Sequence, residues 1–434
     1  MNLRILLITL FFTKIALALT LDEAIEEAIR NNFLIKKRIE LIKAAEKEKY
    51  EAIADFLPKI SYSYTYQRFK ERPYAIFENP LIPEKKYRVH IGGIDQFSWD
   101  ITLSQPLFTG FYLISKYKIA KLGVELNRLY RDQAILDIVQ DVKVSYFQVL
   151  LSKRYLKIAQ EEVIQLSSHL KDAENFYRQG IIPYNDLLKS KVALFQAKQN
   201  LVKARANLKI AISRLNTVLE RDIDEKVELK DIDSLEKVRY ELKSLYSIAL
   251  QKRPEIKALK IAIKQARQKI RAAKSGFYPH IYLYARYEQI GEDPFAKEND
   301  YGRSYNAFIG FQAKWTLFEW GKTKAAVEKQ IHRYRALLNE LEKLKDRIKL
   351  EVKSIYEELK VAEKNIETAR IALSQAKENF RITDLQYKQN LTTSTEVLDA
   401  RTYLTQAEVN YYSALYGYMI LKAKLERAIG VMRL

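Results

Sequence analysis

The second half of the chain repeats the first, and this duplication limits the possible folds more than any other feature of the sequence. A shift of 210 positions places Tyr146 on Tyr356, and nearer the start of each half a shift of 221 positions places Pro58 on Pro279. A unit of about 210 residues is much longer than a solenoid repeat, so we expect each half to be a complete structural module. The extra residues of the first half lie between Pro58 and Leu107, and such a length difference belongs in an exposed loop.

One stretch of each half has the hydrophobic period of a coiled coil. Across 341–380, apolar or small residues recur at alternating steps of three and four, and the matching stretch 134–177 repeats this pattern. No Pro or Gly occurs from about 124 to 179 or from 322 to 390, so at ~1.5 Å per residue each helix could extend for roughly 100 Å. We expect long helices at about 110–179 and 322–390.

Each long helix ends at a residue that suits a left-handed C-cap, Gly180 in the first half and Asn390 in the second. Residues that can begin a new helix follow within a few positions. We therefore expect return helices at about 184–216 and 395–429, so that each half contains one long helical hairpin.

Before each long helix the hydrophobic period falls to two, which is the period of a β-strand. Ile60, Tyr62 and Tyr64 alternate with Ser61 and Ser63, and three further segments alternate in the same way. Each alternation spans about ten residues, which is enough for a tilted strand to cross a bilayer, and terminal Tyr and Trp suit the interfacial aromatic girdle. The predicted strands lie at about 58–69, 96–108, 280–289 and 304–317.

The N-terminus has the pattern of a signal peptide at residues 1–18. Arg4 precedes a short apolar stretch, and the segment ends in Ala16-Leu17-Ala18, which signal peptidase accepts, although Lys14 interrupts the apolar region. The predicted mature chain consists of a first repeat at 19–220, which begins with helices at 21–56, a linker at 221–241 and a second repeat at 242–434.

Composition excludes several classes of protein. The 434 residues include no Cys, so disulfides, thiolate metal sites and Cys nucleophiles are absent. No run of ~18 apolar residues occurs, which excludes a multi-span helical membrane protein. The 74 Lys and Arg against 54 Asp and Glu suggest nucleic-acid binding, but export argues against it, so we expect no nucleic-acid partner.

Four strands per chain are too few to enclose a pore. An open sheet edge cannot face lipid, because its N–H and C=O groups would have no partner, so strands from several copies must close one barrel. Two chains would supply eight strands, which side chains nearly fill, whereas three would supply twelve and leave a lumen. The strand faces opposite the apolar ones carry Ser, Thr, Asp, Gln, Asn and Lys, which suits water.

The whole mature chain resembles the TolC family of outer-membrane efflux and export ducts. The resemblance rests on the duplicated module, on the strand-to-helix junctions Leu107-Phe108-Thr109-Gly110 and Leu317-Phe318-Glu319-Trp320-Gly321, and on segments 177–200 and 387–410. It implies a mainly α fold with a small β part. In such a fold, a homotrimer forms a twelve-stranded barrel in outer-membrane lipid, with four strands per chain, which continues into a long periplasmic α-helical barrel of coiled-coil hairpins. The resemblance also implies a periplasmic adaptor (membrane fusion) protein and an inner-membrane transporter as partners, in a tripartite efflux pump or a type I secretion system.

The resemblance further implies a gate at the periplasmic tip. Family members close this end with acidic rings just after the second-half tip, and the matching segment places these pore acids at Glu396 and Asp399. The two acids are three positions apart at the start of a helix, so both can face one axis and attract cations where three copies meet. The alternative is that the two carboxylates only interact with the partial positive charge at the helix N-terminus. That interaction stabilises a helix by ~0.3–1 kcal/mol for each carboxylate.

The family also ties its closed state with bonds between the first-half tip and the second long helix. Asp186 occupies the acidic position of that link and Tyr387 the phenolic one. Thr392 stands where a family member has Arg, so one salt bridge of the family is missing here. Asp186 could equally be an acid that complements a helix N-terminus.

An enzyme is not expected. The chain has four isolated histidines, which are predicted to be surface residues: His90, His169, His280 and His332. It has no HExxH, Walker, Gly-rich or nucleophile-elbow motif. No cofactor or metal is therefore expected. The main alternative function is a soluble periplasmic coiled-coil adaptor or structural protein, which would have no use for aromatic strands with an apolar face.

Overall fold

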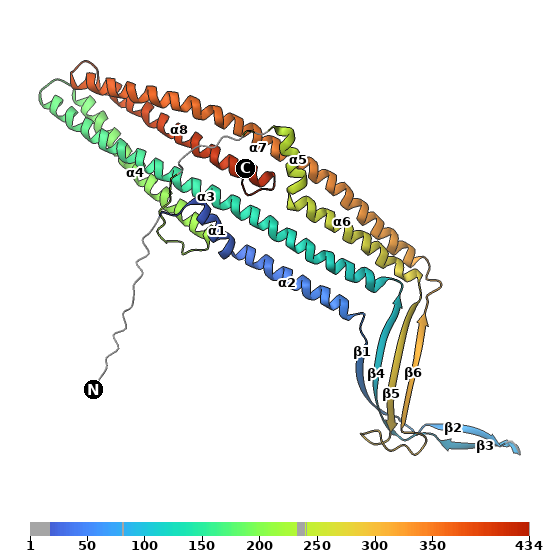
Figure 1. The fold of residues 1–434 in the computed structure, drawn as a ribbon. Coiled ribbons are helices and arrows are strands. Elements are labelled where there is room, and N and C mark those ends of the chain that lie inside the picture. The colour runs from blue at the N-terminus through green and yellow to red at the C-terminus, as the bar shows by residue number, and fades with distance from the viewer. Residues whose placement is uncertain (1–17, 80–81, 232–238, 240, 434) are drawn as a thin grey trace, which may run out of the picture. The chain divides into compact units, whose positions relative to one another are not determined.

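In the computed structural model, the helices and strands, which Figure 1 draws as a ribbon, form two compact units. The structure describes residues 18–79, 82–231, 239 and 241–433, so the expected signal peptide, apart from residue 18, lies outside the described residues. The strand unit comprises 41–127 and 259–340, and the helix unit comprises the rest of the described chain. Helices α2, α3, α6 and α7 contribute residues to both units.

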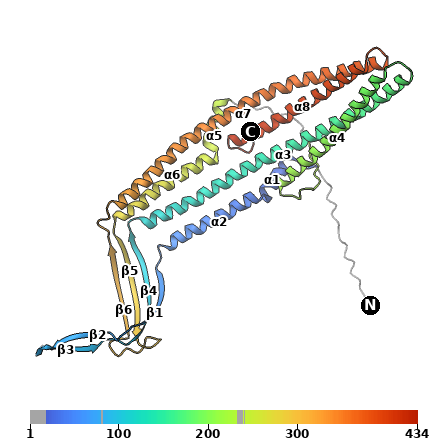
Figure 2. The same cartoon turned by 180° about the vertical axis from the view of Figure 1, so that it is seen from behind.

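The strand unit is built on a four-stranded antiparallel sheet with the order β1-β4-β5-β6. The four strands lie side by side in both views (Figures 1 and 2). At one end, the helix end, β4 and β6 lead into α3 and α7; at the other, the loop end, 292–304 connects β5 to β6. The strands are β1 Lys59–Arg68, β4 Asp95–Thr109, β5 His280–Gly291 and β6 Tyr305–Lys314, so that β6 ends before the predicted position 317.

A hairpin that the sequence analysis did not predict follows β1. Strands β2 (Tyr74–Asn79) and β3 (Ile82–His90) form their own two-stranded sheet, which occupies the connection that is longer in the first half. Adjacent apolar residues such as Ile76 and Phe77 weaken the period-two pattern here, because neighbours in a strand point to opposite faces.

The helix unit contains two long helical hairpins, α3–α4 and α7–α8, whose tips lie at the same end of the unit (Figure 1). In each hairpin the coiled-coil seam packs on the return helix. A buried cluster of Leu166, Leu194 and Ala197 lies in the first hairpin, and Leu373 and Leu404 belong to the corresponding cluster in the second. The helices are α1 Leu21–Asn31, α2 Phe33–Ala54, α3 Tyr112–Arg178, α4 Tyr184–Leu219, α5 Leu242–Lys252, α6 Pro254–Ala273, α7 Lys322–Lys388 and α8 Ser394–Ala428.

The duplication extends to the backbone at the chain reversals. At the hairpin tips, Gly180 and Asn390 have φ of +75° and +60°. At the strand-to-helix junctions, two successive residues have positive φ in each half, 110–111 and 320–321. One residue of each junction pair is not glycine, although this conformation is costly for residues with a Cβ. The two halves therefore make the same sharp turns with different residues.

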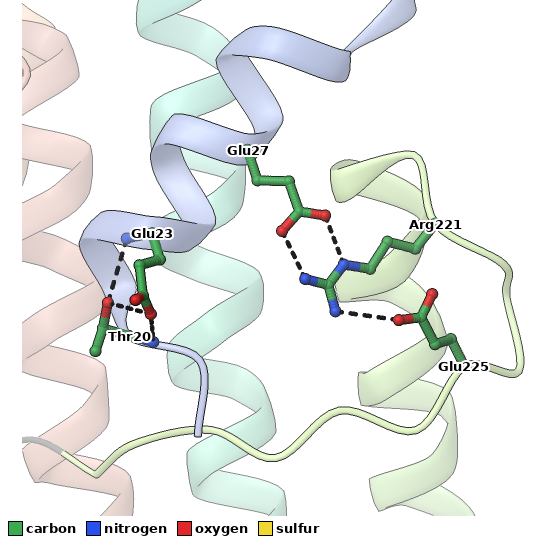
Figure 3. A network of polar contacts seen from close by, with 5 residues as sticks. All are labelled: Thr20, Glu23, Glu27, Arg221 and Glu225. Atoms are coloured by element: carbon green, nitrogen blue, oxygen red, sulfur yellow. Dashed lines mark hydrogen bonds and ion pairs between the residues drawn. The ribbon is translucent and has the colours of Figure 1, made fainter. Parts of the chain in front are cut away.

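The start of the helix unit is anchored to the end of α4 by an ion pair (Figure 3). Thr20 and Glu23 cap α1 reciprocally, with Glu23 Oε2 accepting from the Thr20 N–H at 2.8 Å. Arg221, which follows α4, donates from Nε to Glu27 Oε1 at 2.7 Å and from Nη2 to Glu27 Oε2 at 2.5 Å. Glu225 accepts a third, longer bond from Arg221 at 3.4 Å. The predicted linker thus begins with residues that hold α1 in place.

Replacing Arg221 by alanine is expected to loosen α1 from α4. The paired side chains of Arg221 and Glu27 are 20% and 19% exposed, so loss of the bidentate bond should cost about 1–3 kcal/mol. Amide hydrogen exchange of residues 21–31 measures this loss, and it should accelerate roughly tenfold. Arg30→Ala, which removes an exposed cation from the same helix, should leave exchange unchanged. Equal protection in Arg221→Ala and the parent protein would contradict the anchoring role.

Candidate functional site

The register of the four-stranded sheet gathers apolar side chains on one face, the apolar face. Ile60 pairs with Leu103, Leu103 with Ala285, and Ala285 with Ile309, so one apolar row crosses all four strands. Because alternate residues share a face, the next rows repeat the pattern. The apolar face includes Ile60, Tyr62, Tyr64, Tyr66, Phe97, Trp99, Ile101, Leu103, Leu283, Ala285, Tyr287, Gln289, Tyr305, Ala307, Ile309 and Phe311, and the charged pair of Arg68 and Asp95 lies on it at the loop end.

Aromatic side chains gather at both ends of this sheet. At the loop end, Tyr66 stacks on Phe97 with ring centroids 4.8 Å apart. At the helix end, Phe318 and Trp320 are in edge contact and stay largely exposed. Between them, aliphatic residues such as Ile309, which is 73% exposed, face outward without cover. Two aromatic bands that flank an aliphatic one are the pattern of strands that cross a bilayer.

The opposite face of the sheet, the polar face, carries mostly hydroxyl, amide and charged side chains. Ser63, Asp100, Glu288 and Asn306 occupy one row of paired positions across the four strands. Tyr284 and Phe308 also lie on this face, in edge contact with centroids 6.0 Å apart. The sheet is therefore a wall with one side suited to lipid and the other to water.

Strands β1 and β6 are the two edges of this wall. Within the described chain, β1 pairs only with β4 and β6 only with β5, so each leaves a row of backbone N–H and C=O groups open. Nearly every residue of both edge strands is exposed. An exposed edge of this kind is a template for pairing with a strand of another chain.

The predicted gate acids lie together on the exposed side of the first turns of α8. Glu396 and Asp399 are exposed, whereas the intervening Val397 and the following Ala400 are buried against the hairpin. Thr393 supplies the N-cap, since its Oγ1 accepts from the Glu396 N–H at 3.3 Å. Both carboxylates therefore point away from the hairpin core, as a pore-facing pair requires.

The other two predicted site residues are close but not bonded. The Asp186 carboxylate accepts from Lys189 Nζ at 3.4 Å, and Tyr387 Oη forms no hydrogen bond of ordinary geometry among the described residues. Tyr387 is 2% exposed. Burial, and to a smaller extent the nearby Asp172 and Asp186 carboxylates, raise the pKa of the Tyr387 phenol. The Asp186–Tyr387 link is therefore not formed in this structure.

A buried chain of hydrogen bonds joins the two hairpins near their tips. Ser394 Oγ lies 2.8 Å from His169 Nε2 and 3.0 Å from Ser190 Oγ. These three residues, the tip junction, come from α8, α3 and α4 and are at most 4% exposed. The ring of Tyr387, on α7, packs on the imidazole with centroids 4.7 Å apart. All four helices of the two hairpins thus meet at one polar cluster.

The prediction that all four histidines are surface residues is wrong for His169. This residue lies beside the seam positions Leu166 and Leu170, and α3 is covered on a second side near the tip because the α7–α8 hairpin packs there. A pattern along one helix shows only its main buried stripe. Burial lowers the pKa of the His169 imidazole, and the Asp384 and Asp172 carboxylates partly oppose this shift.

Comparison with known families gives the chain its assignment. The model of the outer membrane efflux protein family matches twice, over residues 24–220 and 245–431. The chain belongs to this family. The two matches correspond to the two repeated halves, so the duplicated module is what the family shares. Members of the family are channels of the outer membrane rather than enzymes.

Individual relatives agree with this assignment. The alkaline protease secretion protein AprF of Pseudomonas aeruginosa is 22% identical over 430 residues, which cover 96% of this chain and 85% of AprF. Outer membrane protein TolC of Vibrio cholerae is 22% identical over 341 residues, with coverage of 78% and 77%. The crystal structure of the CmeC outer membrane channel of Campylobacter jejuni has a TM-score of 0.79 at 16% identity, covering 94% of this chain and 85% of CmeC. The predicted TolC-like fold and outer-membrane localisation are confirmed, and the soluble adaptor is not favoured.

The described residues contain neither a membrane-spanning helix nor a cluster of metal-binding side chains. No helix in that part of the chain has the length and hydropathy needed to cross a membrane. The same residues bring together no group of three His, Asp or Glu side chains that could hold a metal ion.

Proposed function

We propose that three copies of this chain form a duct that serves as the outer-membrane exit of a tripartite efflux pump or a type I secretion system. The observation that carries the proposal is the sheet with one apolar face, one polar face and two open edges. In lipid these edges must be paired, and further copies of the chain supply the pairing strands. Three four-stranded sheets give a twelve-stranded barrel with a lumen.

The hairpins support assembly with further copies. Helix α4 carries large apolar side chains at heptad-like spacing that stay exposed among the described residues, of which Val192 and Phe195 are 68% and 66% exposed. Helix α7 has a comparable stripe that includes Leu350 and Val361, 69% and 59% exposed. Stripes of this size are normally buried, and copies arranged in a ring of hairpins would cover both. The stripe residues are Leu188, Val192, Phe195 and Val202 on α4 and Leu350, Val361, Ile371 and Ile382 on α7.

In this assembly the duct is a passive conduit, closed at its periplasmic tip. Glu396 and Asp399 of three copies line the narrow end, and Asp186 and Tyr387 form the closed-state link when the copies assemble. A periplasmic adaptor protein and an inner-membrane transporter supply recognition and energy. The secretion role named for AprF supports a secretion system as the setting, and the efflux role in the name of the matching family supports an efflux pump.

Paired substitutions on one strand test the membrane orientation of the sheet. Ile309→Lys puts a charge on the apolar face of β6, and it should cost about 2–4 kcal/mol if that face meets the middle of the bilayer. Gln312→Lys puts the same charge on the polar face and should be tolerated. The measurements are the yield of oligomer in outer-membrane fractions and channel activity in planar bilayers. Equal insertion of both variants, or a monomeric protein without channel activity, would refute the proposal.

A further inference from the structure

A belt of polar and charged side chains crosses the polar face of the sheet at one level. Ser63 pairs with Asp100, Asp100 with Glu288, and Glu288 with Asn306. Directly paired residues on one face of a sheet lie side by side, so these four side chains form a continuous row. Arg286, two positions from Glu288 on β5, belongs to the same face and reaches into the row. We call these five residues the belt.

The two acids of the belt are held differently. Asp100 Oδ1 accepts from Arg286 Nη2 at 2.9 Å and also from Ser63 Oγ, and Asp100 Oδ2 accepts from Thr102 Oγ1 at 2.7 Å. Arg286 Nη1 is 3.8 Å from Glu288 Oε2, which is too long for a hydrogen bond. Arg286 therefore binds Asp100 more closely than Glu288, and the three groups together keep one net negative charge.

The belt is the main charged feature in the middle of the polar face. Along the four strands, the other basic residues of this face, Lys59 and Lys314, lie at the helix end of the sheet. The two acids and one arginine of the belt itself give each chain an excess of one negative charge, and Arg303, from the loop between β5 and β6, lines the same small cavity as Glu288 and Asn306. Asp95 also lies on β4 but belongs to the apolar face, at the loop end, where Tyr66 donates to it at 2.8 Å.

We propose that the belt makes the membrane segment of the duct prefer cations, with Glu288 as the residue that determines this preference. The inference rests on the proposed function, because only an assembly of copies around a lumen turns the belts into a ring. Three chains would then place three excess carboxylates at one level of the wall. In a wide, water-filled lumen their field reaches about 10 Å at 0.1 M salt and about 30 Å at 0.01 M, so the preference should be strongest in dilute salt.

The test measures reversal potentials of the full-length protein in planar bilayers under a KCl gradient. All variants carry Glu396→Ala and Asp399→Ala, so that the tip acids do not contribute. Glu288→Gln brings the belt charge to zero and should lower the ratio of K⁺ to Cl⁻ permeability about twofold in dilute salt. Arg286→Gln makes the belt more negative and should raise the ratio. Asp95→Asn, which makes the same acid-to-amide change on the apolar face, should leave the ratio unchanged.

Opposite shifts for Glu288→Gln and Arg286→Gln that disappear at about 1 M KCl, where the Debye length is near 3 Å, would support the belt. Misfolding cannot produce shifts of opposite sign. The belt proposal fails if the two variants shift the ratio in the same direction or not at all, or if Asp95→Asn has as large an effect. Absence of any channel in the background protein would instead refute the proposed duct, and the inference with it.

Discussion

Removing both tip acids is expected to raise the conductance of a single channel by about twofold or more. The variant is Glu396→Ala with Asp399→Ala. Both carboxylates are exposed on one side of α8, and in a trimer six of them would meet at the narrow end of the duct. We propose that cations bound there would relieve the mutual repulsion of the carboxylates, hold the entrance in its constricted form and block it. Single-channel recording with and without Mg²⁺ measures both effects, and block by Mg²⁺ should weaken.

A second pair of variants separates charge from size at the tip. Glu396→Gln with Asp399→Asn keeps the side-chain volume and should still relieve the Mg²⁺ block, because an amide binds divalent cations more weakly than a carboxylate. Glu357→Ala with Glu358→Ala removes two exposed acids from α7 and serves as the control. Unchanged conductance in the tip variants, or an equal change in the α7 control, would show that the acids serve only the N-terminus of α8.

Acidification is expected to open the tip through His169. While the tip junction joins the two hairpins, the imidazole is buried and its pKa lies below the ordinary value of 6.5. If the hairpin tips separate, the ring is hydrated and its pKa returns to that value. The open state therefore binds more protons. The tip junction is fully stable above pH 6.5 and is weakened as the pH falls below it, by up to about 1.4 kcal/mol per pH unit for each histidine. Channel conductance should rise as the medium is acidified through this range.

The charges around His169 set how strongly it responds. Asp172 on its own helix and Asp384 on α7 favour the protonated ring, whereas Lys388 on α7 disfavours it. Ser190 of α4 contributes only a hydroxyl to the junction, and Arg401 of α8 lines the same small cavity as His169. Burial outweighs the two carboxylates, because the net shift of the His169 pKa is downward.

Variants of the tip junction distinguish titration from packing. His169→Gln offers an uncharged nitrogen near the position of Nε2, so it should keep the bond to Ser394 and remove the response below pH 6.5. Ser394→Ala removes the hydroxyl between His169 and Ser190 and should open the tip at every pH, at a cost to the junction of about 1–3 kcal/mol. The Glu396→Ala, Asp399→Ala background excludes titration of the gate acids. A pH response that survives His169→Gln would contradict the role of the imidazole.

The tip junction also bears on the family's salt bridge that this chain lacks. Thr392 stands where a family member has Arg, and the Asp186–Tyr387 link is not formed here. The bonds from Ser394 to His169 and Ser190 connect the same two hairpin tips without either group. These bonds are buried, so they are less screened by salt than an exposed ion pair would be.

Local sequence patterns were sufficient to predict most of the helices and strands of the fold. The alternation from Ile60 to Tyr66 predicts a strand with one apolar face, and the seam from 341 to 380 predicts a long helix, because each depends only on the geometry of its own element. The duplication predicted equivalent reversals at Gly180 and Asn390, and both have positive φ. The hairpin of β2 and β3 was missed, since Pro73, Pro80 and adjacent apolar residues obscure its period.

The sequence by itself determined which residues share a face of each strand or helix, and it placed Glu396 and Asp399 on one side of a helix start. Only the tertiary structure decided which faces meet. The pairing of β4 with β5 brings Asp100 beside Glu288, far away in the chain, and the approach of the two hairpins buries His169 against Ser394. Periodicity records the direction of a side chain relative to its own backbone, whereas register and packing between distant segments result from the summed contacts of the whole chain.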